Sequence, residues 1–337
     1  MKTTATIPTR IDLLGGTLDL YPIYDCLDNP ATLNLGVTAS AEVTVEDAVG
    51  LAIESVDQKQ KLNFKSLSQL DRDSLPLLTR LVLSIWQEDW PLFHLKTKAR
   101  SPAGAGLGGS SALAVAVAGT LFRHAEKKGL AKVPEEAALV DLVKSVETRL
   151  IHCPAGCQDY WGALRGGLNL IRFGSGNPIV KTLKGSFLNE LGERLILCYS
   201  GVARDSGMNN WQIFKSFFDR DKSLIGQLQD IADLANEACI EAESHNVGSM
   251  ITLSKKEWQL RKALWPAIVT SETAAIEKIT LENGGHLARV CGAGGGGVVA
   301  ILCEPDLREK ISAALVAEDF QILPAVAAEK GLTFDEV

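Results

Sequence analysis

The sequence has no run of about 18 apolar residues, so we expect no membrane-spanning helix. Its first ten residues, MKTTATIPTR, lack the apolar stretch of a secretory signal peptide. It also has no basic excess, because 34 Lys and Arg stand against 41 Asp and Glu and leave a net charge of −7. These absences argue against a membrane protein, a secreted protein and a nonspecific binder of nucleic acid.

The seven cysteines are odd in number and scattered along the chain. This pattern is typical of reduced thiols in a cytoplasmic protein rather than of a disulfide framework. His152, Cys153 and Cys157 lie close together, but no second Cys or His pair at ligand spacing accompanies them. We therefore expect a cytoplasmic location and no zinc site.

The 337 residues are enough for two domains, and 46% apolar with 22% charged residues is typical of a globular protein. The first hundred residues have the alternation of strands, most clearly over 33–45 and 93–98. Two helices are predicted next. One runs from a serine N-cap at Ser110 to Gly129, and the other starts at Pro134.

A strand over 166–173 and a turn over 175–178 follow, and we place a domain boundary near this turn. The predicted domains are therefore 1–180 and 181–337. The second half opens with a strand over 195–199, continues with long helices, and ends with short strands around a further helix. Because strands and helices do not alternate strictly, we expect an α+β fold rather than a doubly wound parallel sheet.

The segment SPAGAGLGGSSA (101–112) places four glycines and a serine pair directly before a predicted buried helix. Glycines allow close backbone approach, and a helix N-terminus offers free N–H groups and a partial positive charge. The alternative is a tight strand-to-helix turn, for which one or two glycines would be enough. We therefore favour a phosphate-binding loop.

Two matches to G-x-G-x-x-G, at 104–109 and 292–297, lack the context of a dinucleotide-binding fold. The first follows a charged stretch instead of a buried strand, and the second precedes a strand instead of a helix. No Walker loop and no protein-kinase motif set is present. The second cluster, CGAGGGG, is either a hairpin or bulge, or a loop pressed against a ligand or the first glycine loop. Its glycine density favours the latter.

Four charged residues are candidates for a site of phosphoryl transfer, which needs oxygen ligands for a metal and a group that orients the nucleophile. Glu147 lies on the flank of the apolar stripe of a predicted helix. This position fits a solvated surface residue and a metal ligand equally well. Asp159 lies in HCPAGCQDYW, predicted as a compact loop, where it could simply cap a short turn. Arg10 and Asp19 flank two glycines in PTRIDLLGGTLDL, which indicates a turn at a ligand or a surface pair.

Three segments, taken in order, resemble the motifs of the GHMP kinases, a family that includes galactokinase, homoserine kinase, mevalonate kinase and phosphomevalonate kinase. They are PTRIDLLGGTLDL, SPAGAGLGGSSA, which is similar to the family's P-x-x-x-G-L-G-S-S-A, and CGAGGGG. The resemblance implies an N-terminal α+β domain with a left-handed β-α-β unit and a ferredoxin-like C-terminal domain. The active site would lie in the cleft between them.

The resemblance also implies ATP and Mg²⁺. Ser110 and Glu147 would hold the metal, and Ser111 is the alternative because Gly109 stands where the family has its first serine. The residues implied to bind the ATP phosphates are Gly104, Ala105, Gly106, Leu107, Gly108, Gly109, Ser110 and Ser111.

Asp159, twelve residues after Glu147, matches the family's catalytic base or orienter, and Arg10 would favour its ionised form. Motif one, R-I-D-L-L-G-G-T-L-D, is similar to the R-x-x-x-x-G-G-G-T-D of bacterial heptose-7-phosphate kinases and their relatives. By this match, the implied substrate-binding residues are Gly16, Thr17, Asp19, Gln158 and Arg204. The glycines of the implied supporting loop are Gly292, Gly294, Gly295 and Gly296.

We therefore expect an ATP- and Mg²⁺-dependent kinase that phosphorylates the anomeric hydroxyl of a sugar or sugar phosphate. The alternatives are a kinase of the mevalonate and homoserine branch and a catalytically silent sensor of sugar or nucleotide. A nicotinamide oxidoreductase is less favoured. The expected partners are a small sugar substrate and ATP, without nucleic acid or membrane, and the protein would be a monomer or a homodimer.

Overall fold

The computed structural model describes residues 1–102, 104–203 and 208–335, and of residues 208–210 it describes the backbone alone. Arg204, which the sequence predicts to contact substrate, lies outside the described residues. Within the described part of the chain, no helix combines the length and apolar character needed to cross a bilayer.

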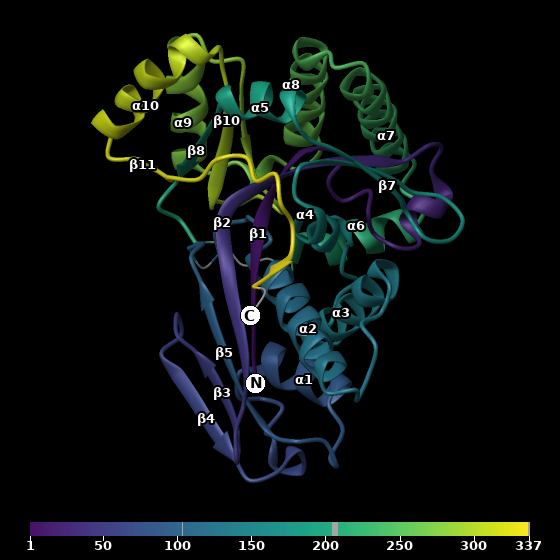
Figure 1. Ribbon diagram of the computed structural model, residues 1–337. Helices are drawn as coiled ribbons and strands as arrows, with labels where there is room; N and C mark the ends of the chain where they lie inside the picture. The colour runs from purple at the N-terminus through teal and green to yellow at the C-terminus, as the bar shows by residue number, and fades with distance from the viewer. Residues whose placement is uncertain (103, 204–207, 336–337) are drawn as a thin grey trace.

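The larger sheet has eight strands in the order β12-β1-β2-β5-β3-β4, and β6 pairs with both β2 and β7. Its pairs are antiparallel except for β3 with β5, which are parallel and are separated in the chain by β4 and α1. Figure 1 shows β1 and β2 running from this sheet into the upper half of the molecule. The strands are β1 (Lys2–Leu14), β2 (Ala31–Asp47), β3 (Leu51–Ser55), β4 (Gln60–Phe64), β5 (Phe93–Ala99), β6 (Leu168–Arg172), β7 (Ile179–Leu183) and β12 (Thr333–Phe334).

Four helices cover this sheet, and α2 is the central one. Helix α2 packs against β1 and β2 and also contacts the other three helices. Its residues from Ser111 to Leu121 are all buried, which confirms the prediction of a buried helix. The four helices are α1 (Pro76–Ile85), α2 (Gly109–Lys127), α3 (Glu136–Ile151) and α4 (Gln158–Arg165).

The smaller sheet has four antiparallel strands in the order β11-β8-β10-β9. Along the chain the pattern is β8, helices, β9, β10, α10 and β11, which is the β-α-β-β-α-β arrangement of a ferredoxin-like domain. The predicted ferredoxin-like half is thus confirmed. Its strands are β8 (Leu195–Tyr199), β9 (Leu287–Val290), β10 (Val298–Leu302) and β11 (Gln321–Ile322).

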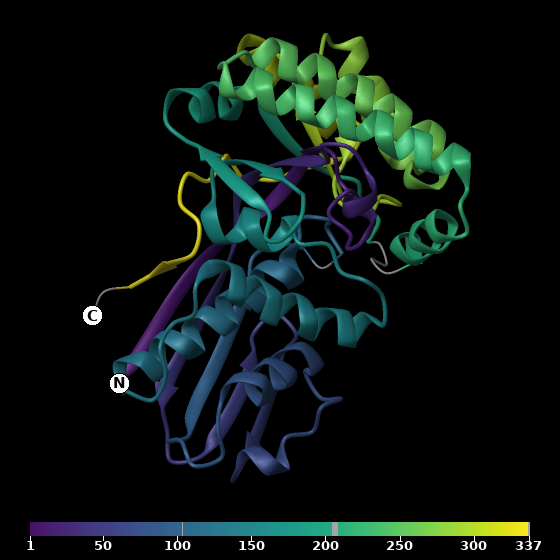
Figure 2. The ribbon, with the colours of Figure 1, turned by 90° about the vertical axis from the view of Figure 1, so that its right-hand side faces the viewer.

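Helices α8, α9 and α10 pack against this sheet, whereas α7 packs against β1 and β2 and lies side by side with α8 (Figure 2). The helices of the second half are α5 (Ser186–Glu193), α6 (Met208–Phe218), α7 (Lys222–Glu243), α8 (Val247–Leu264), α9 (Ser271–Glu282) and α10 (Arg308–Ala317). Short 3₁₀ turns occur at Ile23–Cys26, Leu67–Gln69, Pro266–Ile268 and Pro305–Leu307.

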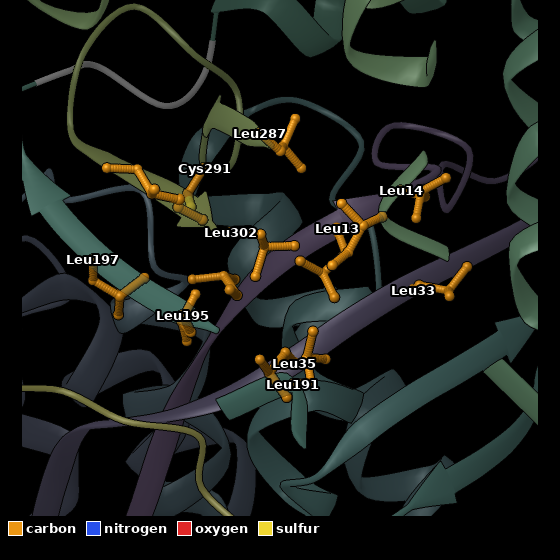
Figure 3. Close-up of a cluster of buried hydrophobic side chains, with 14 of the residues drawn as sticks. Leu13, Leu14, Leu33, Leu35, Leu191, Leu195, Leu197, Leu287, Cys291 and Leu302 are labelled. Carbon is orange, nitrogen blue, oxygen red and sulfur yellow. The ribbon is translucent and has the colours of Figure 1, made fainter. Parts of the chain in front are cut away.

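The two halves share one apolar core. In Figure 3, Leu13 and Leu35 from β1 and β2 lie opposite Leu195 and Leu302 from the smaller sheet, and all belong to one buried cluster. The chain changes sheet between β7 and β8, and β12 returns to pair with β1. We therefore propose a domain boundary close to the predicted residue 180, with the last strand belonging to the first domain.

Three local predictions are wrong. The first hundred residues include helix α1, whose start at Pro76 and apolar stripe outweigh the surrounding strand pattern. The segment predicted as a compact loop contains the start of α4 at Gln158. The serine pair does not cap α2, because Gly108 occupies the N-cap with a positive φ of 67° and both hydroxyls bond elsewhere.

The second glycine cluster joins β9 to β10 and also lies against the first glycine loop. The N–H of Val298 donates to the carbonyl of Ala105 at 2.7 Å. A Cβ at Gly297 would stand 2.6 Å from that same oxygen, so only glycine permits this approach. The hairpin and the loop-against-loop contact are therefore both present.

Replacing Gly297 by Ala tests this contact, and Gly295 provides a matched control. Both glycines have a positive φ, of 83° and 79°, but a Cβ at Gly295 would meet nothing within 4 Å. Gly295→Ala should cost about 1 kcal/mol of unfolding free energy for backbone strain alone. Gly297→Ala should cost roughly 1–3 kcal/mol more because the two loops must move apart. Equal losses in urea denaturation would contradict the close contact.

Candidate active site

A cavity of about 630 Å³ opens at the N-terminus of α2. The first half contributes residues of β1, the first glycine loop, α3 and α4 to its lining, and the second half contributes Arg261, Gly292 and Ala293. Because both halves supply side chains or backbone, the cavity occupies the predicted position between the domains.

The first glycine loop forms one wall of this cavity. Gly104, Gly106 and Gly108 all have positive φ values, and no side chain caps the helix that follows. The N-terminus of α2 therefore keeps its partial positive charge for a ligand, which suits an anion such as a phosphate. Every residue predicted to bind phosphate lines the cavity, namely Gly104, Ala105, Gly106, Leu107, Gly108, Gly109, Ser110 and Ser111.

Glu147 of α3 faces the first turn of α2 and is 8% exposed, so it is not a solvated surface residue. Its carboxylate accepts hydrogen bonds from Ser110 Oγ at 2.8 Å, Ser111 Oγ at 2.9 Å and the Tyr160 hydroxyl at 2.6 Å. Burial and the Glu147 charge raise the pKa of Tyr160 well above its usual value, so the hydroxyl remains a donor. Ser110 is exposed toward the cavity while Ser111 is buried.

Arg10 and Asp159 form a close ion pair beside the glycine loop. Arg10 Nε donates to Asp159 Oδ1 at 2.7 Å, and Arg10 Nη1 donates to the carbonyl of Gly106 at 2.8 Å. Burial opposes the charge on Arg10, but the carboxylates of Asp159 and Asp12 outweigh it and raise the pKa of Arg10. Asp159 lies in the first turn of α4, and its Oδ2 would be 3.1 Å from a Cβ at Gly108. The Asp159 carboxyl group is thus held against the phosphate-binding loop.

The predicted substrate-binding residues Gly16, Thr17, Asp19 and Gln158 also line the cavity. Asp19 Oδ2 accepts the N–H of Gln158 at 3.0 Å, and a Cβ at Gly156 would stand 2.0 Å from that oxygen. The Gln158 side chain is 6% exposed, and among the described residues its Oε1 has no hydrogen-bond partner. Because Gln158 lines the cavity, an ordered water or a ligand there could supply the donor for this oxygen.

The glycines of the predicted supporting loop have different surroundings. Gly292 lines the cavity and donates its N–H to Asp12 Oδ1 at 2.6 Å. Gly294 and Gly296 instead allow close packing, because a Cβ at either position would approach Ile268 or Val202 within 3 Å. Gly295 has open space around its Cα and donates its N–H to the carbonyl of Ile268.

Sequence reasoning missed a group of buried charges that joins this site to the second half. It consists of Asp12, Glu257, Arg261 and Arg289, all of which are buried. Asp12 lies among apolar residues of the first motif, and an acid in a buried strand is a signal that could have been used. Glu257 and Arg261 are spaced i, i+4 on α8, which from sequence is indistinguishable from an ordinary surface pair.

Burial raises the pKa of Asp19 to about 6, the N–H of Gln158 opposes this shift, and the Asp159 carboxylate adds to it. The folded protein therefore binds this proton more tightly than the unfolded chain, in which an Asp titrates near 3.8. The stabilisation from protonated Asp19 is present at low pH and is lost as the pH rises through about 6.

Relative to Asp19→Asn, the wild-type protein should lose about 2 kcal/mol of unfolding free energy between pH 4 and pH 7. Urea denaturation of both proteins at each pH measures this, because the difference between them removes the contributions of all other titrating groups. A difference that stays constant with pH would contradict a buried, destabilised carboxylate at this position.

Two family models match the chain, the GHMP kinases N terminal domain over residues 77–167 and the GHMP kinases C terminal model over residues 226–321. These ranges together make up more than half of the chain and lie on both sides of the cavity. The N-terminal model matches a part of the chain that includes β5 of the larger sheet, and the C-terminal model matches a part that includes β9 and β10 of the smaller sheet.

Whole-chain comparisons agree with the two family models. The D-glycero-alpha-D-manno-heptose 7-phosphate kinase of Campylobacter jejuni is 26% identical over 331 residues, covering 94% of each chain. The bifunctional fucokinase/GDP-fucose pyrophosphorylase of Arabidopsis thaliana is 25% identical over 330 residues, covering 90% of this chain and 30% of that protein. A D-glycero-D-manno-heptose 1-phosphate kinase from Bacteroides thetaiotaomicron has the same fold, with a TM-score of 0.78, 21% identity and 99% coverage of both chains. The chain therefore belongs to the GHMP kinase family.

Proposed function

We propose that this protein is an ATP-dependent kinase that transfers the γ-phosphate to the anomeric hydroxyl of a sugar or a sugar phosphate. The observation that carries the proposal is the ion pair of Arg10 and Asp159 beside Gly108 of the phosphate-binding loop. The same cavity is lined by Asp19 and Gln158, whose side-chain oxygens can accept hydrogen bonds from sugar hydroxyls. Names of related proteins support the same substrate class, since they include heptose-phosphate kinases and a fucokinase.

The backbone of the first glycine loop and the uncapped N-terminus of α2 would bind the triphosphate of ATP. Gly106 and Gly108 have no side chains to block the approach of phosphate oxygens, and the helix dipole favours their negative charge. The described residues of this loop carry no basic side chain of their own, and the nearest one, Arg10, lines the same cavity and donates to the carbonyl of Gly106.

Ser110 and Glu147 fit a Mg²⁺ site, and we assign them this role. Their hydroxyl and carboxylate oxygens are of the type that Mg²⁺ prefers, they lie 2.8 Å apart, and both line the cavity. Exposure favours Ser110 over the buried Ser111 as the protein hydroxyl. The described residues hold no cluster of three His, Cys, Asp or Glu, but Mg²⁺ bound by phosphates and water needs only one or two protein ligands. When bound, Mg²⁺ neutralises charge on the phosphates.

Asp159 would align the acceptor hydroxyl and accept its proton as the acceptor oxygen attacks the γ-phosphorus. The new P–O bond forms as the bond to the bridging oxygen breaks, and ADP leaves with that electron pair. Arg10 keeps the carboxylate in place through two of its nitrogen atoms, at 2.7 Å and 2.6 Å from Asp159 Oδ1. Thr17, Asp19 and Gln158 would orient the sugar, and Arg204 is proposed as a further substrate contact on sequence grounds.

A coupled assay of ADP release tests the substrate class. The panel contains free hexoses, free heptoses, their terminal phosphates, and mevalonate and homoserine as acceptors of other GHMP kinases. We expect turnover with at least one sugar or sugar phosphate and none above background with mevalonate or homoserine. Turnover confined to mevalonate or homoserine would overturn the proposal.

Asp159→Asn should lower kcat by about 10²–10⁴-fold, because the amide cannot accept the hydroxyl proton. Nucleotide affinity, measured by calorimetry, should change little because Asp159 is assigned to the acceptor. Asp141→Asn is a matched control, since that carboxylate is exposed on α3 and pairs with nearby Lys144. An Asp159→Asn enzyme with wild-type turnover would show that the base is elsewhere.

A further inference from the structure

A chain of four buried charges connects the second half of the protein to the acceptor side of the cavity. Asp12 accepts the N–H of Gly292 at 2.6 Å and an Arg289 N–H at 3.1 Å. Arg289 also donates to Glu257 at 2.9 Å, and Glu257 accepts from Arg261 Nε at 3.0 Å and Nη2 at 2.7 Å. The two positive and two negative charges balance, so each buried ion has a partner of opposite sign.

The chain of buried charges ends at the loop that follows β1. Arg261 Nη2 donates to the carbonyl of Gly16 at 2.6 Å, and Arg261 Nη1 donates to Thr17 Oγ1 at 3.3 Å. Arg261, Gly16 and Thr17 all line the cavity. Helix α8 of the second half therefore holds a loop of the first half, at the wall where the acceptor would bind.

Thr17 has an unfavourable backbone conformation. Its φ is 77°, in the left-handed region, which a β-branched residue rarely adopts. Such a conformation is strained and persists only when the surroundings impose it. The two bonds from Arg261 and the complete burial of the next residue, Leu18, are surroundings of that kind. Glycine would relieve the strain but would lose the hydroxyl that Arg261 holds.

We propose that Arg261 is a positioning residue that, by fixing Thr17, determines which acceptor the cavity binds. This inference rests on the proposed sugar kinase function and adds a residue of the second half to the acceptor site. Arg261 would act through Thr17 and Gly16 rather than by contact with the reacting atoms.

The chemistry of Thr17 explains how this works. Its Oγ1 accepts a hydrogen bond from Arg261, and its own O–H can donate one to a ligand. Asp19, when ionised, and Gln158 Oε1 are hydrogen-bond acceptors in the part of the cavity where the sugar would bind. One fixed hydrogen-bond donor and two hydrogen-bond acceptors suit a polyhydroxyl substrate. Such a substrate can present both hydroxyl hydrogens and a hydroxyl oxygen, arranged in one order.

Substitutions at Thr17 test the proposal without removing a buried charge. Thr17→Val keeps the shape and the β-branch but loses the hydroxyl, and should raise the acceptor KM about five- to tenfold. The ATP KM should stay within twofold, and kcat should fall by less than KM rises. Thr17→Ser returns the hydroxyl and should recover most of the lost affinity. Thr252→Val, on the exposed face of α8, is the matched control for loss of a threonine hydroxyl.

Thr17→Gly separates positioning from simple structural support. It relieves the strained φ, so the thermal midpoint should not fall, yet the acceptor KM should rise at least as much as in Thr17→Val. A structural role alone would make midpoint and affinity change together. Arg261→Lys, which can still pair with Glu257 but cannot span Gly16 and Thr17 as well, should also raise the acceptor KM selectively.

The possible results distinguish this inference from the proposed function. A wild-type enzyme that uses a sugar, with an unchanged acceptor KM in Thr17→Val, would overturn the inference alone. Equal increases in the ATP KM and the acceptor KM would also overturn it. A wild-type enzyme that uses no sugar or sugar phosphate in the panel would overturn the proposed function and this inference together.

Discussion

Arg10 is the group on which the arrangement of the site depends. It lies in β1 and is 3% exposed, so its charge must be balanced inside the protein. Its guanidinium bonds to Asp159 and to the carbonyl of Gly106, and its own N–H donates to the carbonyl of Leu107. One residue therefore links β1, the phosphate-binding loop and α4. Because Arg10 is 3% exposed while the Asp159 side chain is 24% exposed, the pairing holds Asp159 at the loop and still leaves its carboxylate open to the cavity.

The second constraint is that neither half completes the cavity alone. The shared apolar core brings β1 and β2 against the smaller sheet, and the two glycine loops meet where the carbonyl of Ala105 accepts the N–H of Val298. The buried charges of Asp12 and Arg289 add directional contacts to this nonpolar interface. Apolar packing is not directional, whereas paired charges tolerate only one alignment, so the two kinds of contact together set the alignment of the halves.

Much of the site could be predicted from local sequence because phosphate binding depends on the backbone. A glycine-rich segment before a helix is visible in any sequence, and the predicted residues from Gly104 to Ser111 all line the cavity. The α+β class followed from the mixed order of strands and helices. The errors came where local patterns were ambiguous. A short apolar stretch formed α1 rather than a strand, and the serine hydroxyls bonded to Glu147 instead of capping α2.

The sequence by itself determined the glycine loops, the buried helix α2, the acidic balance and the resemblance to GHMP kinases, because each depends on residues close together in the chain. It left open whether Glu147 was a surface residue and whether Asp159 simply capped a short turn. Only the tertiary structure decided that both face the cavity, that Gln158 keeps a buried acceptor without a described partner, and that Arg261 reaches Thr17 across 244 positions of the chain. Such contacts arise when the two halves pack together, and no local pattern of residues encodes them.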